Sequence, residues 1–251
     1  MKILRVMADT PSSIALSELA RQVNMAPSNV YPYLVSFCRS GMTVQDPLSN
    51  RYDLGPLAGQ LGFAALRRMD GLTLGVEALT AAVQETRLDG HLCAWGPSGP
   101  IVLRWLSASS ATLLRIQEGT TLPLLTSATG RVWAALLPRP TVALLFAQAL
   151  KREAHASGQP VAACRTEVEK ALAQVRKDGL AVSHGEQRRG SDAVSAPIRG
   201  MDGRIIYSIT LTGGGPKVDV SPGGAAARAL LSHCRDVSYR LGAPPMVSES
   251  V

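Results

Sequence analysis

Three hydrogen-bonding side chains lie close together near the start of the chain, at Ser28, Asn29 and Tyr31. Such side chains can exchange hydrogen bonds with base edges in the major groove of DNA. Asn29 is the strongest candidate, because a carboxamide can form two hydrogen bonds with adenine. Pro32 follows them and lacks a backbone N–H, so we expect a kink or an early 3₁₀ turn in their helix. A polar helix face in contact with water has the same composition, and the residue types leave both interpretations open.

Cations that could hold DNA phosphates are few in this region. The helix that carries Asn29 has no Lys or Arg before Arg39. We therefore assign phosphate contacts to Arg21, Arg39 and Arg51, although each could be an ordinary surface arginine. Through residue 60 the chain has five Lys or Arg residues against four Asp or Glu residues. We expect DNA binding to depend on two or more copies of the chain and on a long site with two half-sites.

A second chemistry is suggested by "TSATGRVW", residues 126–133, where small residues precede a predicted helix. The first turn of a helix has unpaired N–H groups and the positive end of the helix dipole, which together attract anions. Farther along the chain, Thr210 and Thr212 alternate on a predicted strand, so both hydroxyls face the same side. These features predict a polar, anion-binding site. A tightly packed strand-to-helix turn without a ligand is the alternative.

Catalytic arrangements are hard to assemble from this sequence. A nucleophile, a base and an orienting group are found only in the trio Ser127, His184 and Glu186. The sequence has no G-x-S-x-G and no H-E-x-x-H, and the glycines at 213–215 lack the G-K-[ST] of a P-loop. The four cysteines form no C-x-x-C pair and no zinc-finger pattern. We expect no enzyme activity, no cofactor and no bound metal.

The elements that must position Asn29 are short helices. Apolar spacing predicts a helix over residues 2–8, a second from Leu16 to Val23 with Ser17 as its N-cap, and a third that ends at Gly41. The segments "MTVQ" and "RYDL" then flank the turn-forming "DPLSN", which predicts a β-hairpin. Three helices and a hairpin in the first 55 residues predict a winged helix-turn-helix. The first predicted helix begins almost at the first residue, and whether an N-terminal arm precedes it is left as an open question.

Behind the hairpin, residues 56–69 predict a connecting helix, and the remaining chain alternates helices with strands. Further helices are predicted at residues 74–85, 130–137, 165–178 and 224–241. Strands are predicted at residues 91–96, 101–106, 180–184, 193–198 and 204–212. This order of elements predicts a second domain that combines a sheet with helices.

The composition bounds the class of protein. The chain has 251 residues, 46% of them hydrophobic and 4% aromatic, so it can form packed cores made mainly of small aliphatic side chains. Its formal net charge of +7 suits a polyanionic partner without requiring one. It has no apolar stretch of about eighteen residues and no signal-peptide pattern. We therefore expect a cytoplasmic protein that does not enter the membrane.

Several segments resemble one family when they are taken in order. The hairpin exit Tyr52-Asp53-Leu54-Gly55-Pro56 is similar to a Y-x-L-G-P pattern. Three rear segments follow, "LPLLTSATGRVWAALLP", "LAQVRKDGLAVSHGEQRRG" and "AVSAPIRGMDGRIIYSITLTGGGP". With these patterns, nearly the whole chain resembles the IclR family of bacterial transcriptional regulators. The three rear segments make the resemblance specific, because a winged helix alone occurs in many unrelated regulators.

The resemblance implies an α+β fold in four parts. These are a winged helix-turn-helix DNA-binding domain at residues 1–56, a linker helix at 57–72, a GAF-like antiparallel-sheet effector-binding domain at 73–243 and a flexible tail at 244–251. The resemblance also implies a homodimer or a tetramer built as a dimer of dimers. We expect a regulator whose binding to a double-stranded DNA operator is switched by a small organic acid. A carboxylate-binding sensor without sequence-specific DNA binding is the alternative.

By position, the resemblance places the effector against the backbone amides of Ala128 and Thr129. The facing wall would consist of four side chains, Ser183, Ala193, Thr210 and Thr212. Ser183 stands where the family usually has a carboxylate, and Ala193 enlarges the cavity. We therefore expect room for a larger or doubly anionic ligand.

Other residues bear on the identity of the effector. Trp95, Trp105 and Trp133 could line an aromatic pocket or belong to the core. Arg131 could neutralise a second carboxylate, or it could face solvent or a second subunit. From the tryptophans we expect an aromatic carboxylate from a catabolic pathway.

Overall fold

The computed structural model of the protein describes residues 2–68, 70–108, 116–185, 191–214 and 219–244. Contacts between residues divide the chain into two compact units, Met1–Met69 and Asp70–Val251. The division lies within the linker segment expected at residues 57–72, and each unit has its own hydrophobic core. Most of the expected flexible tail, residues 245–251, lies outside the described residues.

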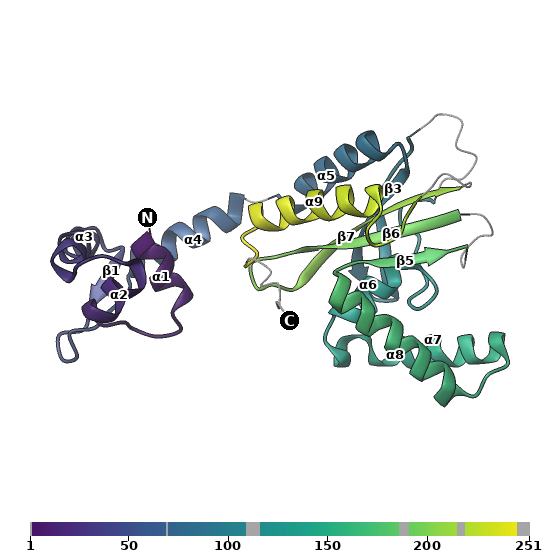
Figure 1. Ribbon diagram of the computed structural model, residues 1–251, viewed down its shortest axis with the longest axis horizontal. Helices are drawn as coiled ribbons and strands as arrows, with labels where there is room; N and C mark the ends of the chain where they lie inside the picture. Colours follow the sequence, from purple (N-terminus) through teal and green to yellow (C-terminus); the bar gives the residue numbers. More distant parts are fainter. Residues whose placement is uncertain (1, 69, 109–115, 186–190, 215–218, 245–251) are drawn as a thin grey trace. The chain divides into compact units, whose positions relative to one another are not determined.

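Within residues 2–68, the front unit has four helices and a β-hairpin (Figure 1). The elements are α1 (Lys2–Asp9), α2 (Leu16–Val23), α3 (Pro27–Ser40), β1 (Thr43–Gln45), β2 (Tyr52–Leu54) and α4 (Pro56–Arg68). The three predicted helices, the hairpin and the connecting helix are confirmed. Val30 and Leu34 of α3 lie in a core with residues of α1, α2 and β2, which turns the opposite side of α3 toward solvent.

The start of α2 differs from the prediction, which places the N-cap at Ser17. In the structure the N-cap is Ala15, and Ser17 lies inside the first helical turn. Ile14 and Tyr52 exchange backbone hydrogen bonds of 2.8 Å in both directions, which keeps the chain extended up to Ala15. The helix therefore begins at Leu16, because pairing with the hairpin overrides the local capping preference.

α3 is an uninterrupted α-helix from Pro27 to Ser40, although it contains Pro32. Every residue of this span is α-helical, so the structure has no 3₁₀ segment at Pro32, and the alternative of a kink stays a prediction. Proline at this position removes the N–H that would bond the carbonyl of Ser28. Because Ser28 and Pro32 are both exposed, that carbonyl can hydrogen-bond to water, and the helix continues.

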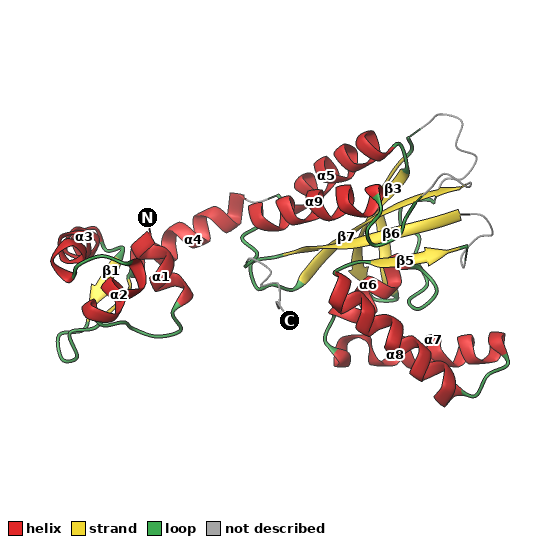
Figure 2. Ribbon diagram, in the orientation of Figure 1, coloured by secondary structure: helices red, strands yellow, loops and turns green. Residues whose placement is uncertain are grey.

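Within its described residues, the rear unit combines a five-stranded sheet with helices on both faces (Figure 2). The elements are α5 (Gly71–Thr86), β3 (Asp89–Gly96), β4 (Gly99–Leu106), α6 (Ala128–Leu136), α7 (Arg139–Ser157), α8 (Val161–Asp178), β5 (Ala181–His184), β6 (Ser191–Arg199), β7 (Ile205–Gly214) and α9 (Ala225–Arg240). The strand order is β4-β3-β7-β6-β5, and all neighbouring strands are antiparallel. This confirms the α+β fold with an antiparallel sheet. None of the described helices is long and apolar enough to span a lipid bilayer.

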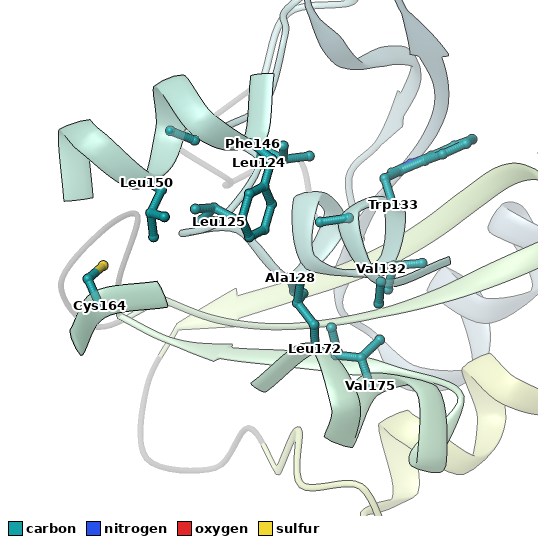
Figure 3. Packing of buried hydrophobic residues seen from close by; sticks show 14 of the residues in the cluster. Leu124, Leu125, Ala128, Val132, Trp133, Phe146, Leu150, Cys164, Leu172 and Val175 are labelled. Atoms are coloured by element: carbon teal, nitrogen blue, oxygen red, sulfur yellow. The ribbon is translucent and has the colours of Figure 1, made fainter. Parts of the chain in front are cut away.

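Two helix layers cover the two faces of the rear sheet. α5 and α9 lie side by side on one face, where Gly75 of α5 packs closely against Leu92 of β3. α6 lies on the other face, with α8 packed against α6 and α7 against α8. Figure 3 shows the core between these helices, with Val132, Phe146 and Leu172 among its members. This core fixes the first turn of α6 over the sheet.

α7 is a helix that the sequence pattern does not predict, and α8 begins at Val161, before the predicted start at 165. The buried residues Phe146 and Leu150 of α7 are spaced as expected for a helix. However, α7 has no side-chain N-cap, and Leu144 on its outer side is 71% exposed. Apolar residues therefore occur around the whole helix and obscure its buried stripe.

Candidate functional site

The outer surface of α3 presents the three expected base-contacting residues to solvent. Ser28, Asn29 and Tyr31 are all exposed, Tyr31 by 51%. The exposed surface also carries Tyr33, at 52%, which the sequence analysis does not select. The intervening Val30 is fully buried and holds the helix against the front core. The surface can therefore offer carboxamide, hydroxyl and aromatic groups to a partner without a change in the backbone.

Arg21 is tied to a carboxylate of its own helix. Its guanidinium donates to both carboxylate oxygens of Glu18, at 2.9 Å from Nε and 2.6 Å from Nη2. Gln22 donates to the same carboxylate at 2.7 Å. These hydrogen bonds, first that of Arg21 and then that of Gln22, lower the pKa of Glu18 to about 2. Glu18 is therefore charged at neutral pH and offsets the charge that Arg21 could offer to a phosphate.

The other two arginines expected to bind phosphate differ from each other. Arg51 follows the hairpin loop, and its Nε donates to the carbonyl of Ser13 at 3.0 Å and to the Ser13 hydroxyl at 3.2 Å. This contact ties the hairpin to the segment before α2. Arg39 is exposed near the end of α3 and has no hydrogen-bond or ion-pair partner within the part of the chain that the structure describes. Arg39 is thus available to a phosphate group.

The start of α6 has the geometry of an anion site. Ser127 is its N-cap, and its hydroxyl accepts from the Gly130 N–H at 2.8 Å and donates to the Pro123 carbonyl at 2.6 Å. The backbone amides of Ala128 and Thr129, in the first turn, have no acceptor among the described residues. Two neighbouring N–H groups at the positive end of a helix can bind a carboxylate.

The four expected wall residues lie on the sheet face that α6 covers. The strand register pairs Ser183 with Ala193 and Ala193 with Thr212, in one row across β5, β6 and β7. Ala193 packs against the core cluster of α6, so the row faces this helix. Thr210 precedes Thr212 on the same face, and its hydroxyl is 2.7 Å from that of Thr129. The structure thus brings together the residues that the resemblance assigns to the effector.

This group of residues is closed to solvent at its centre. Ala128, Thr129 and Thr210 are each 1% exposed, and Ser183 is 4% exposed. Ala193 and Thr212 are half-buried at the edge of the group. A ligand that reaches the amides of α6 must therefore displace or move side chains of the site.

Two further residues of this group, His91 and Ser195, escape the sequence analysis. Nε2 of His91 lies 3.0 Å from Oγ1 of Thr129, and the hydroxyls of Thr210 and Ser195 are 2.9 Å apart. Burial lowers the pKa of His91 to about 4, so the imidazole is neutral at pH 7. His91 and Ser195 both pair with Thr210 across the sheet. The one signal in the sequence is a histidine inside an otherwise apolar strand.

Tryptophans border the polar residues. Trp105 stacks on His91, with ring centroids 5.8 Å apart and planes inclined by 12°. Trp133 is buried, and its Nε1 donates to the Ser208 hydroxyl at 2.9 Å. Trp95 tilts against Trp133 with a centroid separation of 5.8 Å. The polar site therefore has an aromatic border, although Trp133 also belongs to the core.

Arg131 has a contact that the sequence analysis does not anticipate. Its guanidinium donates to the Leu125 carbonyl at 2.9 Å and to the Val182 carbonyl at 3.0 Å. These hydrogen bonds tie the segment before α6 to β5. These hydrogen bonds explain why an arginine occupies this position without requiring that it bind a ligand.

The trio Ser127, His184 and Glu186 does not form a catalytic arrangement among the described residues. The Ser127 hydroxyl is engaged as a helix cap, and His184 lies 3.4 Å from Asp192 rather than beside Ser127. Glu186, the third member of the trio, lies outside the described residues. A group of three His, Cys, Asp or Glu side chains that could hold a metal ion is likewise not found in the part that the structure describes.

Comparisons with known proteins cover both units. The family model "IclR helix-turn-helix domain" matches residues 1–47, and "Bacterial transcriptional regulator IclR C-terminal" matches residues 67–239. The HTH-type transcriptional regulator BhcR of Paracoccus denitrificans (strain Pd 1222) is 26% identical over 232 residues, which are 91% of this chain and 81% of BhcR. The crystal structure of Pseudomonas aeruginosa HmgR has a TM-score of 0.81 and 34% identity, and the match covers 98% of this chain and 97% of that one.

A more distant solved structure is that of an IclR homolog from Microbacterium hydrocarbonoxydans complexed with 4-hydroxybenzoate. It is 16% identical, with a TM-score of 0.55 over 96% of both chains, and this likeness shows the shared fold alone. The helix-turn-helix match contains α3, and the C-terminal match contains α6 and the rear sheet. The family models therefore cover both candidate sites except Arg51, which lies between the two matched segments.

Proposed function

This chain belongs to the IclR family of bacterial transcriptional regulators, and from that membership we propose that a small carboxylate switches its binding to operator DNA. Its relatives are DNA-binding regulators and not enzymes, and its helix-turn-helix places it with them. One observation carries the carboxylate proposal. The amides of Ala128 and Thr129, which take no acceptor among the described residues, lie at the start of α6 beside the buried Thr210 hydroxyl.

On the DNA side, we propose that Asn29 reads a base edge, with Ser28 and Tyr31 beside it. Their exposure on α3 supports this role. Phosphate contacts are assigned to Arg21, Arg39 and Arg51. Because two of these arginines already hold intramolecular partners, each front unit offers little charge to DNA. We therefore propose a homodimer or a dimer of dimers on an operator with two half-sites.

On the effector side, the carboxylate accepts hydrogen bonds from the amides of Ala128 and Thr129. Ser183 offers a hydroxyl in the facing row, and Ala193 leaves room between Ser183 and Thr212, whose own hydroxyl donates to the Asp192 carbonyl at 3.2 Å. Ser183 carries no charge, so the row does not repel a second negative group. The tryptophans at the border favour an effector with an aromatic ring. The proposed effector is an aromatic acid from a catabolic pathway, and 4-hydroxybenzoate, bound by the Microbacterium hydrocarbonoxydans homolog, is an acid of this kind.

The switch requires that the acid bind two arrangements of the protein with different affinities. The buried hydroxyls join α6 to the sheet, so a ligand among them changes how this helix is held. We propose that the change reaches the front unit through α4 and alters the spacing of recognition helices across the oligomer. Binding of acid and binding of operator are then coupled in both directions.

The DNA part is tested by fluorescence anisotropy with fragments of the region that flanks the coding sequence. We expect tight, salt-sensitive binding to one fragment, and a change in affinity or footprint when the acid is added. Binding that is indifferent to sequence would instead support a sensor without specific DNA recognition. An acid that binds but leaves affinity and footprint unchanged would refute the switch.

The effector part is tested by a thermal-shift screen of small mono- and dicarboxylates. Thr129→Pro removes one of the two amides at a position where a helix tolerates proline, so it should abolish the shift. Thr210→Val should weaken it. Ala162→Pro, at the corresponding position of α8, is the matched control and should leave the shift intact. If Thr129→Pro and Thr210→Val both leave the thermal shift unchanged, the acid binds elsewhere on the protein. If no acid causes a thermal shift in the wild type, the carboxylate proposal is refuted.

A further inference from the structure

The buried hydroxyls between α6 and the sheet form a hydrogen-bond chain with a single direction. The chain ends at the carbonyl of Ile209, which can only accept, so the Ser195 hydroxyl donates to it at 3.3 Å. Ser195 has one hydroxyl hydrogen and therefore accepts from Thr210 at 2.9 Å. For the same reason Thr210 accepts from Thr129 at 2.7 Å, and Thr129 accepts from Nε2 of His91 at 3.0 Å.

This direction determines the tautomer of the imidazole. Nε2 of His91 carries the hydrogen, and Nδ1 is unprotonated because burial lowers the pKa of the ring to about 4. Nδ1 is thus an acceptor, and it is buried with no partner among the described residues. Trp105, stacked on this ring, has the complementary group, a buried Nε1–H donor that also lacks a partner in the described part of the chain. His91 is 4% and Trp105 6% exposed.

We propose that His91 and Trp105 are specificity residues of the effector site, and that together they select an effector with a hydroxyl group. The inference rests on the proposed carboxylate-binding function and names the substituent that the site recognises. A hydroxyl group both donates and accepts, so its chemistry matches the acceptor Nδ1 of His91 and the donor Nε1–H of the stacked Trp105. Because unpaired buried polar atoms are costly, one group that supplies both partners binds favourably.

Other substituents match this pair of atoms less well. A second carboxylate only accepts, so it faces the lone pair of Nδ1, whereas an ammonium group only donates and faces the N–H of Trp105. Water has the same pattern as a hydroxyl, so an effector hydroxyl and a bound water are the two sources of this chemistry. The stacked rings of His91 and Trp105 also favour contact with an aromatic ring. The inferred ligand is a ring-hydroxylated aromatic acid whose carboxylate lies at the amides of α6.

Matched pairs of acids test this inference on the full-length protein. Isothermal titration compares benzoate and phenylacetate with their monohydroxy isomers. At least one hydroxylated acid should bind about tenfold or more tightly than its parent acid. His91→Phe removes the acceptor and Trp105→Phe the donor, while both keep an aromatic ring, so each should reduce this preference to about twofold or less. The readout is the ratio of the two affinities, because general damage to the buried network lowers the affinity for parent and hydroxylated acids together, whereas loss of the hydroxyl contact lowers only the second.

Trp95→Phe is the matched control, because Trp95 lies on the same face without a buried unpaired atom, and it should keep the preference. Equal wild-type affinity for parent and hydroxylated acids would mean that water fills the position, which overturns the inference. A preference that survives in both His91→Phe and Trp105→Phe also overturns it. In these two cases carboxylate binding itself still stands. If no acid of either kind binds, the proposed carboxylate function fails together with the inference.

Discussion

The two candidate sites hold their polar side chains in opposite ways. On α3, Asn29 and Tyr31 are exposed and make no side-chain hydrogen bonds to other described residues. Their polar groups can therefore hydrogen-bond to water. Beneath α6, Thr129 and Thr210 are 1% exposed and hydrogen-bond to each other. The proposed DNA-binding surface is thus already exposed to a partner, whereas the proposed effector site is a closed network that a ligand would have to enter.

This difference predicts which substitutions change binding alone and which change binding and stability together. Substitutions on an exposed helix face change stability by about 0.5 kcal/mol or less in most proteins, so on α3 they should act on DNA affinity alone. In the rear site the hydroxyls of Thr129 and Thr210 join α6 to the sheet and would also surround the proposed ligand. Substitutions there should change folding and ligand binding together. Measuring both quantities for each variant therefore tests the comparison.

The largest expected effect is that of Gly130→Ala, at the start of α6. A Cβ atom there would lie 2.1 Å from the Pro123 carbonyl oxygen and 2.5 Å from that of Leu124, so backbone segments must move apart. We expect the free energy of unfolding of the rear unit to fall by at least about 3 kcal/mol. Urea unfolding followed by tryptophan fluorescence measures this unit, because all three tryptophans belong to it.

Gly59→Ala is the matched control for that substitution. Gly59 lies in α4, and nothing lies within 4 Å of an added Cβ atom. Helix propensity should then raise stability by about 0.5–1 kcal/mol, as followed by circular dichroism. The two glycine variants should therefore change stability in opposite directions. Similar responses would contradict the close packing assigned to the first turn of α6.

A second large effect should appear in the pH dependence of the rear unit. The pKa of His91 is lowered from 6.5 to about 4 by burial. Between these values the unfolded chain binds a proton that the folded chain does not, so the free energy of unfolding decreases as pH falls from 6.5 toward 4. The loss should be at most about 3 kcal/mol. Urea unfolding across this range should show a weaker pH dependence of the free energy of unfolding for His91→Phe than for the wild type. An equal dependence of the free energy of unfolding on pH in the wild type and in His91→Phe would contradict the lowered pKa of His91.

The exposed site could be predicted from local patterns, but the buried site could not. Ser28 and Asn29 follow from the helical period around the buried Val30, because that period determines which side faces solvent. The His91–Thr129 contact joins residues 38 positions apart, and Thr129–Thr210 joins residues 81 apart. Both contacts depend on the strand register and on where α6 packs, which no local pattern determines. Local patterns indicate the start of α6 and the alternation of Thr210 with Thr212 separately, and the family resemblance combines them in one site, whereas His91 has no such support.

A smaller effect is expected for Asn29→Ala, which tests the DNA surface. Loss of the carboxamide should lower affinity for the selected operator fragment about tenfold, with stability changed by about 0.5 kcal/mol or less. Binding to a scrambled fragment should be unaffected, because contacts with phosphates carry it. Arg39→Ala should instead weaken binding to both fragments equally. If Asn29→Ala also weakens both fragments, Asn29 does not read bases. Fluorescence anisotropy of the wild type and both variants on the two fragments measures the six affinities.

The smallest effect is expected for Glu18→Gln, which frees the guanidinium of Arg21 with little change in shape. Acid cannot release this pair near neutral pH, because the pKa of Glu18 is about 2. Operator affinity at low salt should rise about two- to fivefold, and the slope of log affinity against log salt should steepen by about one unit. Glu77→Gln, which removes a carboxylate 3.5 Å from Arg240 in the rear unit, makes the same change in net charge. If operator affinity rises in both variants, the cause is the change in net charge. If it rises in neither, Glu18 does not compete with phosphate for Arg21.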